Sequence, residues 1–410
     1  MFETNLNERK NDFDWPLLLA TIGLMIIGVA FIYSATSYSE SARALPWFKQ
    51  TFARQIVWYV FGIGAALAIC VIDYVTLARW STVGYWLMIL LLIAVFFSPA
   101  INYAKRWIPL GFFNLQPSEF AKIAFILLAA NFLSRPMEEL RQPEVFFVML
   151  GMTALPFALI IKEPDMGSAL VFLSVSLIMM FVAGVPKQFL LKLVGGVGLL
   201  AVLLVLAILF APRRVEIVDK VMVKVVDKIV VPYQQLRLQT FFGSDFALRN
   251  APPEKRKEFE RVLRDKSYNV EQSMISVGSG GLTGKGWRQG TQYALGFLPS
   301  AGARNDFIFS VIAEEEGFVG SVVILTLYTV LLFSGIKIAS QARDRLGKLL
   351  AIGVVTLLFS HVFENIGMNI RLMPVTGIPL PLLSYGGSSV VCSLIAIGIL
   401  HNVHIHRRSY

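Results

Sequence analysis

The sequence predicts an all-α polytopic membrane protein with about ten transmembrane helices and one long extracytoplasmic loop. Two observations support this fold class. Of the 410 residues, 56% are hydrophobic and 16% are charged, whereas soluble proteins contain about 45–50% apolar and about 25% charged residues. Long apolar runs also recur along the chain, and one polar stretch, 212–305, separates the first seven runs from the last three.

A transmembrane helix needs about 20 largely apolar residues. The spans that we expect are roughly 15–34, 55–72, 83–101, 120–134, 145–161, 166–185, 188–211, 307–336, 349–369 and 382–402. The fourth span is short, and only a few polar residues join the fifth to the sixth. We treat residues 1–410 as a single transmembrane domain that contains the loop 212–305.

The distribution of Lys and Arg predicts the orientation. Ten spans place both chain ends on one side, where the short segments carry about thirteen basic residues against about seven on the other side. Cytoplasmic loops are enriched in Lys and Arg, so we expect both termini in the cytoplasm. The formal charge of +10 arises at the ends of apolar runs, and we therefore expect no nucleic-acid partner.

Ionisable residues at membrane depth are rare and mark functional sites by default. The first cluster lies in "KRWIPLGFFNLQPSEFAK" and supplies five candidate substrate-binding residues: Arg106, Gln116, Ser118, Glu119 and Lys122. Pro117 suits the first turn of a helix, and Glu119 and Lys122 share a helix face because they are three residues apart. Alternatively, these two residues form an ion pair that holds the helices together.

Two further clusters border the membrane. "KEPDMGSA" carries Glu163 and Asp165 between two spans, and a tight turn alone does not explain two acids there. "FENIGMNIRLMPVTGIPLPLLSYGGSS" is interrupted by three prolines. Irregular backbone at membrane depth survives only where it is buried in protein or lines a wet cavity. We therefore expect a cavity wall here, and the candidate residues of the two clusters are Asp165, Asn365, Ser384 and Gly386.

A glycine-rich loop is predicted in "QSMISVGSGGLTGKGWRQGTQ". It is not a Walker motif, because the first required glycine falls on Ser279 and Gly286 follows the lysine. Its exposed N–H groups could still hold an anion, and the alternative is a flexible linker. The candidate residues are Gln272, Ser273, Gly280, Gly281, Lys285 and Gln292.

Together, "RWIPLGFFNLQPSE", "EPDMGSA", "GSGGLTGKGW", "NDFIFSVIAEE" and "LPLLSYGGSS" resemble motifs of the SEDS family (shape, elongation, division, sporulation) of bacterial cell-wall proteins. The similarity runs from roughly residue 15 to 405. "PVTGIPLPLLSYGGSS" looks more like the elongation branch, RodA, than the division branch, FtsW. Glu163 is a departure, since Gln is common there in relatives.

The resemblance implies a peptidoglycan glycosyltransferase that polymerises lipid II at the outer face of the bacterial cytoplasmic (inner) membrane during elongation. The family's essential aspartate matches Asp306. The implied partners are a class B penicillin-binding protein, which is a transpeptidase, and other membrane proteins of the elongation complex. Two other functions stay open: a lipid II flippase, and a scaffold without activity of its own.

The stretch "NDFIFSVIAEEEGFVG" contains four acids. If one helix runs through them, Asp306 lies about 12 Å above Glu314, whereas paired glycosidase carboxylates lie roughly 5–10 Å apart. Asp306 would share a face with Ser310 and Ala313. We therefore predict Asp306 as the single catalytic carboxylate. We place the glutamates where the helix enters lipid and expect them to orient, hydrogen-bond or pair with nearby Arg and Lys. The alternative is that Asp306 only caps the helix.

In this hypothesis Asp306 acts as the general base. Arg106, Lys122 and the glycine-rich loop stabilise the leaving pyrophosphate, and direct displacement inverts the donor carbon. No cofactor is certain. A divalent cation, Mg²⁺ or Mn²⁺, could assist, although the sequence contains no defined ligand set, and both Cys70 and Cys392 lie inside apolar runs.

Overall fold

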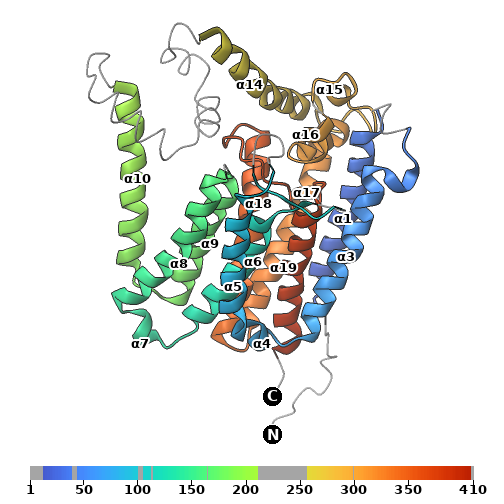
Figure 1. Ribbon diagram of the computed structural model, residues 1–410. Helices are drawn as coiled ribbons and strands as arrows, with labels where there is room; N and C mark the ends of the chain where they lie inside the picture. Colours follow the sequence, from blue (N-terminus) through green and yellow to red (C-terminus); the bar gives the residue numbers. More distant parts are fainter. Residues whose placement is uncertain are drawn as a thin grey trace.

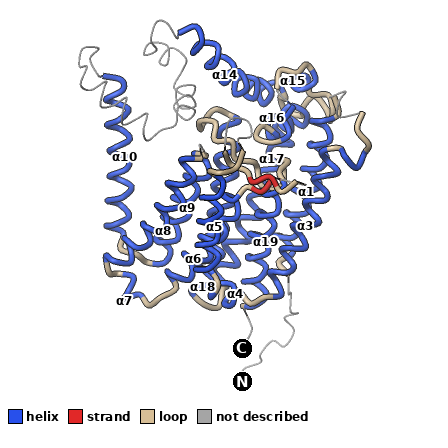
Figure 2. The backbone as a smooth tube through the Cα atoms, viewed as in Figure 1, coloured by secondary structure: helices blue, strands red, loops and turns tan. Residues whose placement is uncertain are grey.

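A computed structural model describes residues 13–38, 44–99, 105–111, 114–163, 165–210, 256–298 and 300–407. Figure 1 shows long helices packed side by side in a bundle, which confirms the all-α fold class. Figure 2 shows the short strand pair of the described residues near the end of the bundle where α17 begins. Residues 212–255, which belong to the predicted long loop, lie outside the described residues.

Among the described residues, ten of the long helices run along the bundle. They are α1 (Trp15–Thr36), α3 (Thr51–Val71), α5 (Ser81–Val95), α6 (Pro117–Leu133), α8 (Pro143–Lys162), α9 (Met166–Ala183), α10 (Lys187–Phe210), α17 (Ile308–Gln341), α18 (Arg345–Asn369) and α19 (Gly387–His406). Seven of them, α1, α3, α8, α9, α17, α18 and α19, are long and apolar enough to cross a membrane, and α5 is a shorter apolar helix. The count of ten spans stays a prediction.

Shorter elements connect these helices. They are the 3-10 helix η1 (Trp47–Lys49), α4 (Tyr74–Arg79), α7 (Met137–Leu140), α15 (Thr291–Ala294), α16 (Ser300–Arg304) and the antiparallel strands β1 (Ile108–Pro109) and β2 (Asn114–Leu115). The predicted long loop also contains α14 (Arg256–Ser279). Gln272 and Ser273 therefore lie on a helix, and their assignment to a glycine-rich loop is wrong.

The described ends of the chain lie on the same side of the bundle. The rings of Phe13, just before α1, and His401, near the end of α19, are 6.1 Å apart. Asp14 also lies 3.7 Å from Lys337 near the end of α17. This agrees with the topology predicted from an even number of spans, and Figure 1 shows α4 and α7 at this same end.

Several helices begin where the sequence supplies a capping side chain. Carboxylates of Asp14, Asp165 and Asp344 accept hydrogen bonds from backbone N–H groups three residues later, at 3.1, 3.3 and 2.8 Å. Pro117 and Pro143 occupy the first turn, where a missing N–H costs nothing. These caps matter at a membrane, where an unsatisfied backbone group is costly.

The most enclosed helices are α18 and α19, whose apolar windows are 67% and 83% buried, against 17% for α3. Polar residues on these two helices therefore face protein and not lipid. Figure 1 shows α10 standing at the edge of the bundle, and its side chains Leu191 and Val194 are exposed. The functional site must consequently be sought around α18 and α19.

Candidate functional site

Asp306 lies in the turn immediately before α17. The helix begins at Ile308, and its N-cap is Phe307, which makes no side-chain capping bond. A continuous helix through Asp306 is therefore not present, because residues 305–307 form a turn. The helical geometry is also interrupted at Gly317, whose φ is 64° and ψ is −155°. The separation and shared face calculated from a continuous helix do not apply.

The backbone around Asp306 is held in place by hydrogen bonds to three successive carbonyl groups, those of residues 304–306. The first accepts a hydrogen bond from the backbone N–H of Tyr385 at 2.9 Å, and the second from the hydroxyl of Ser384 at 2.6 Å. The third accepts from the side-chain amides of Asn365 and Asn369 at 2.9 and 3.0 Å. Elements distant in sequence thus orient a half-buried aspartate.

A second layer of polar side chains supports this anchor. Asn369 accepts from Ser273 on α14 at 3.1 Å and from Ser310 on α17, and the two serine hydroxyls are 2.5 Å apart. All three side chains are buried. Ser273 and Asn365 are predicted as substrate-binding residues. In the structure they belong, with Ser310 and Asn369, to a buried hydrogen-bond network that supports the Asp306 backbone.

The glutamates after Asp306 anchor the glycine-rich loop. Glu314 accepts from Lys285 Nζ at 2.6 Å and from the backbone N–H groups of Thr291 and Gln292 at 2.8 and 3.1 Å. Glu315 accepts from the Ser34 hydroxyl of α1 at 2.5 Å. Both glutamates are at most 2% exposed. The expected pairing of these glutamates with a nearby basic residue is therefore confirmed for Glu314, and both side chains are enclosed by protein.

The backbones of this loop and of α17 lie in direct contact around Gly317. The N–H groups of Lys285 and Gly286 donate to the carbonyls of Glu314 and Glu315 at 3.0 and 2.8 Å. A Cβ atom on Gly284, where φ is +77°, would lie 2.1 Å from the Glu315 carbonyl oxygen. The glycines are therefore needed for close approach of the two chains.

The two basic residues of the loop have protein partners. Lys285 forms the ion pair with Glu314, and the guanidinium of Arg288 lies 5.5 Å from the ring centre of Tyr33 and 5.9 Å from that of Trp287. The loop is well connected to the bundle, so the flexible-linker alternative is wrong.

Arg106, two residues before β1, contacts the turn between α8 and α9. It is 8% exposed, and its Nε donates to the Glu163 carbonyl oxygen at 3.1 Å. A cation is favourable at this helix C-terminus because it faces the negative end of the helix dipole. The Glu163 side chain is 1% exposed, and neither carboxylate oxygen has a hydrogen-bond partner among the described residues.

Burial raises the pKa of Glu163 from 4.5 to about 9, and the nearby Asp165 charge adds to the rise while Arg106 opposes it. Glu163 is therefore neutral at pH 7. A neutral carboxyl group can both donate and accept hydrogen bonds, as a glutamine amide can. Glu163 can therefore serve where the family resemblance implies a glutamine.

Gln116 joins this region to α19. Its amide donates to the Asp165 carboxylate at 3.3 Å and to the Ser118 hydroxyl at 3.2 Å. Its backbone N–H donates to the hydroxyl of Ser388, in the first turn of α19, at 3.1 Å. The structure thus brings together four predicted residues, Arg106, Gln116, Ser118 and Asp165, at one end of the helices.

Glu119 and Lys122 form a buried ion pair of 2.7 Å, with 3% and 2% of their side chains exposed. The alternative weighed for these two residues, an ion pair inside the bundle, is therefore present. Lys122 Nζ also lies 2.8 Å from His361 Nε2 on α18. The buried Glu364, one turn along α18, interacts electrostatically with Lys122 and Asp165.

A column of polar side chains on α18 therefore connects Asp306 to Lys122. It consists of Asn369, Asn365, Glu364 and His361, all at most 5% exposed. The ends of the column are eight residues apart, or about 12 Å along the helix axis. Sequence reasoning missed three of its members, His361, Glu364 and Asn369. The sequence does contain a signal for them, because these polar residues recur at helical spacing in an otherwise apolar run.

The remaining candidates are more scattered. Gln292 Oε1 is buried without a hydrogen-bond partner among the described residues. The N–H of Gly386 donates to Gln55 at 3.4 Å, and Gln272 is half-buried on α14. Gly280 packs where a Cβ would lie 1.9 Å from the Ala313 carbonyl oxygen, whereas Gly281 faces open space.

Within the described ranges, no group of three or more His, Cys, Asp or Glu side chains could hold a metal ion.

Comparisons with known proteins agree with this architecture. The chain is 34% identical to the peptidoglycan glycosyltransferase RodA of Treponema pallidum, over 96% of this chain and 98% of that protein. It is 31% identical to the peptidoglycan glycosyltransferase MrdB of Escherichia coli, over 97% and 95%.

Two solved structures are also similar. One is a chain from work on the structural coordination of polymerization and crosslinking by a peptidoglycan synthase complex, with a TM-score of 0.72, 26% identity and coverage of 97% and 99%. The other is the rod shape determining protein RodA of Thermus thermophilus, with a TM-score of 0.63, 26% identity and coverage of 97% and 98%. The family model for FtsW, RodA and SpoVE, described as cell cycle protein, matches residues 15–409. The chain therefore belongs to the FtsW, RodA and SpoVE family of cell cycle proteins, the SEDS family.

Proposed function

We propose that this protein is a peptidoglycan glycosyltransferase that polymerises lipid II at the outer face of the bacterial cytoplasmic membrane, with Asp306 as the general base. The observation that carries the proposal is the anchoring of residues 304–306 by Ser384, Tyr385 and two asparagines of α18. Catalysis requires a group held in one geometry, and these bonds hold the backbone of the half-buried Asp306 in that way.

The reaction requires proton removal and charge stabilisation. The Asp306 carboxylate accepts the proton of the acceptor hydroxyl, whose oxygen attacks the donor anomeric carbon as the bond to pyrophosphate breaks. Arg106 stabilises the pyrophosphate that leaves with the bonding electrons, whereas the buried Lys122 is paired with Glu119. Arg304 adds a cation two residues before the base, and its Nε has no hydrogen-bond partner among the described residues. We assign Lys285 to holding the loop.

The proposed partner is a class B penicillin-binding protein. The similarity to a chain of a peptidoglycan synthase complex that couples polymerization and crosslinking supports this assignment. Basic residues at the end of the bundle that carries both chain ends, such as Arg79 and Arg345, support a cytoplasmic position for both termini.

The test is reconstitution in liposomes that contain lipid II, with and without the penicillin-binding partner. The Asp306→Asn variant should lower the polymerisation rate at least 100-fold, since a general base contributes about 10²–10⁴-fold. Lipid II binding should persist because the backbone anchors do not involve the carboxylate. Glu271→Gln, an exposed acid on α14, is the matched control and should retain wild-type activity.

Three other outcomes count against the proposal. Full activity of the Asp306→Asn variant would exclude the base. Movement of labelled lipid II between leaflets without polymer would favour a flippase. Partner binding without any polymer from the wild-type complex would favour a scaffold.

A further inference from the structure

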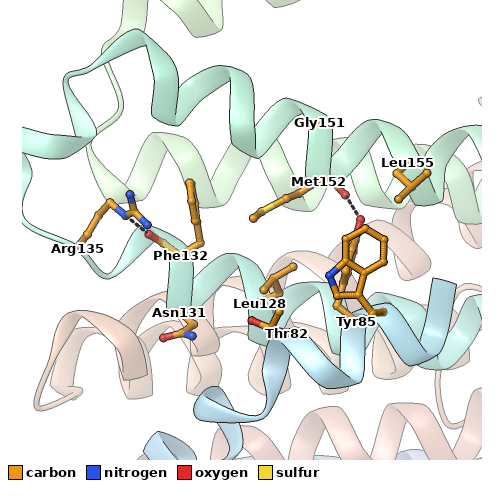
Figure 3. Close-up of a pocket in the computed structure, with 10 residues that line it drawn as sticks. Thr82, Tyr85, Leu128, Asn131, Phe132, Arg135, Gly151, Met152 and Leu155 are labelled. Atoms are coloured by element: carbon orange, nitrogen blue, oxygen red, sulfur yellow. Dashed lines mark hydrogen bonds between the residues drawn. The ribbon is translucent and has the colours of Figure 1, made fainter. Parts of the chain in front are cut away.

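A pocket of about 520 Å³ opens between α5, α6 and α8 (Figure 3). Its volume lies within the range of about 300–1,000 Å³ that is typical of small-molecule sites. Aromatic and aliphatic side chains form most of its wall, including Trp86, Phe132 and Leu155. None of its lining residues belongs to the polar column or to the Asp306 segment.

The polar groups of this wall are mostly bound to the protein itself. The Tyr85 hydroxyl donates to the carbonyl oxygen of Met152 at 2.8 Å, and the Asn131 amide donates to that of Ala78 at 3.1 Å. The interior of the pocket therefore presents apolar surface, which favours a hydrocarbon occupant over a sugar or a nucleotide.

A single cationic group lies at one end of the pocket. Figure 3 shows Arg135 there and Leu155 at the opposite end. Its guanidinium carbon is 4.1 Å from the ring centre of Phe132, and Nε donates to the Phe132 carbonyl oxygen at 2.8 Å. Glu139 lies 3.6 Å from Nη1, but both side chains are at least 35% exposed, and such pairs contribute little. Arg135 has five N–H donors, of which the Nε–H binds the Phe132 carbonyl, and its half-buried guanidinium lies at this end of the pocket.

We propose that this pocket binds an acyl chain of an anionic phospholipid, whose phosphate lies on Arg135. The site is at the end of the bundle that carries α4 and α7, the end away from the start of α17 (Figure 1). Along α8, Leu155 is twelve residues from Pro143, or about 18 Å, which is close to half of the roughly 30 Å hydrocarbon core. A chain that enters at this face therefore reaches the bottom of the pocket.

This site and the proposed catalytic site would bind their anionic groups at opposite ends of the bundle. A lipid-linked substrate would carry its pyrophosphate to the opposite face, near Asp306 and Arg106. An anionic phospholipid of the leaflet at this end instead places phosphate beside Arg135, in a region that also contains Arg345 and Lys187. Basic pockets between transmembrane helices at the cytoplasmic side are typical binding sites for such headgroups.

The chain offers a matched pair of glycines for the test. Gly151 of α8 lines the pocket, and a Cβ there would have no heavy atom within 4 Å. Gly84 of α5 also has open space around its Cβ position but does not line the pocket. Phe at Gly151 should fill the pocket without a clash at Cβ, and Phe at Gly84 should leave the pocket empty.

The experiment is native mass spectrometry of the purified full chain titrated with phosphatidylglycerol or phosphatidylcholine. The wild type should bind phosphatidylglycerol about fivefold more tightly, as one basic residue predicts. Gly151→Phe should weaken phosphatidylglycerol binding at least tenfold, and Gly84→Phe should not. Arg135→Gln should remove the fivefold preference while phosphatidylcholine binding persists. Thermal unfolding of each variant verifies the fold.

Equal affinity of the wild type for both lipids would overturn the proposal. The same holds if Gly151→Phe and Gly84→Phe bind phosphatidylglycerol equally well. A parallel titration with a polyprenyl phosphate identifies the substrate tail as occupant if Gly151→Phe weakens that binding as much, which would also overturn the proposal.

Discussion

Asn365 provides the clearest link between a single side chain and the proposed chemistry. Its amide nitrogen donates to the carbonyl oxygens of Asp306 and Ile378, at 2.9 and 2.8 Å, and the side chain is fully buried. Two segments that have no regular structure of their own are thereby joined at one point on α18. The residue acts through the backbone of Asp306 and is a positioning residue.

Replacing Asn365 by Asp should lower the turnover number about 100-fold and change KM little. The carboxylate cannot donate to either carbonyl, and displacement of a reacting group by about 1 Å costs on this order. Steady-state kinetics with lipid II measure the split between kcat and KM.

Asn402 supplies the control for this experiment. Its buried amide also donates to two carbonyl oxygens, those of Ile69 and Ile72 at the end of α3, but at the opposite end of the bundle. Asn402→Asp should lower thermal stability to a similar degree and preserve kcat in the folded protein. Equal losses of kcat in both variants would show that the effect of Asn365 is not positional.

At the scale of secondary structure, the important feature is the pairing of α17 with the glycine-rich loop. The interruption at Gly317 exposes helix backbone to hydrogen bonding, since Phe318 N–H donates to Gly281 O at 2.9 Å. Glu314 then satisfies backbone N–H groups of the loop. The loop is consequently fixed by hydrogen bonds to the first part of α17, directly after Asp306.

Two glycines of this loop should differ in their response to alanine. Gly281→Ala imposes only the left-handed backbone penalty of about 1–2 kcal/mol, because its Cβ would meet open space at φ +59°. Gly284→Ala adds a clash with the Glu315 backbone and should cost at least about 3 kcal/mol. Hydrogen exchange of the Lys285 and Gly286 amides measures the difference. Equal protection of these amides in both variants would contradict the close approach of the Gly284 and Glu315 backbones.

At the scale of the whole molecule, an apolar bundle surrounds a set of buried ionisable side chains. Lys122 is neutralised by Glu119, whereas Glu163 has no hydrogen-bond partner for its carboxylate among the described residues. With a pKa raised to about 9, Glu163 binds a proton in the folded state over a range where the unfolded chain has released it. Folding stability must therefore depend on pH through this group.

The contribution of Glu163 to stability should fall as the pH rises from about 4.5 to about 9, because the folded state binds more protons than the unfolded state there. Glu163→Gln mimics the protonated form and removes this dependence. The unfolding temperature of the variant should therefore rise relative to wild type between pH 5 and pH 9 and level off above. Glu144→Gln, an exposed position at the start of α8, should show no such trend.

Individual elements show how far sequence reasoning reaches. The apolar runs predicted the long helices, because the membrane requires their length and hydrophobicity. Pro117 correctly predicted the start of α6. The predicted span 307–336 begins one residue before α17, which starts at Ile308. The continuation of α14 through Gln272 and Ser273 could not be predicted, because polar side chains suit a helix or a loop equally.

The sequence by itself determined the fold class, the family and the identity of the polar residues in an apolar chain, because composition and motifs are local properties. Only the tertiary structure decided what those residues do to one another. It paired Lys285 with Glu314, and it placed Asn365 and Ser384 on the carbonyls of Asp306 and Asn305. These partners lie 29 to 79 positions apart, and long-range contacts of this kind depend on how helices pack.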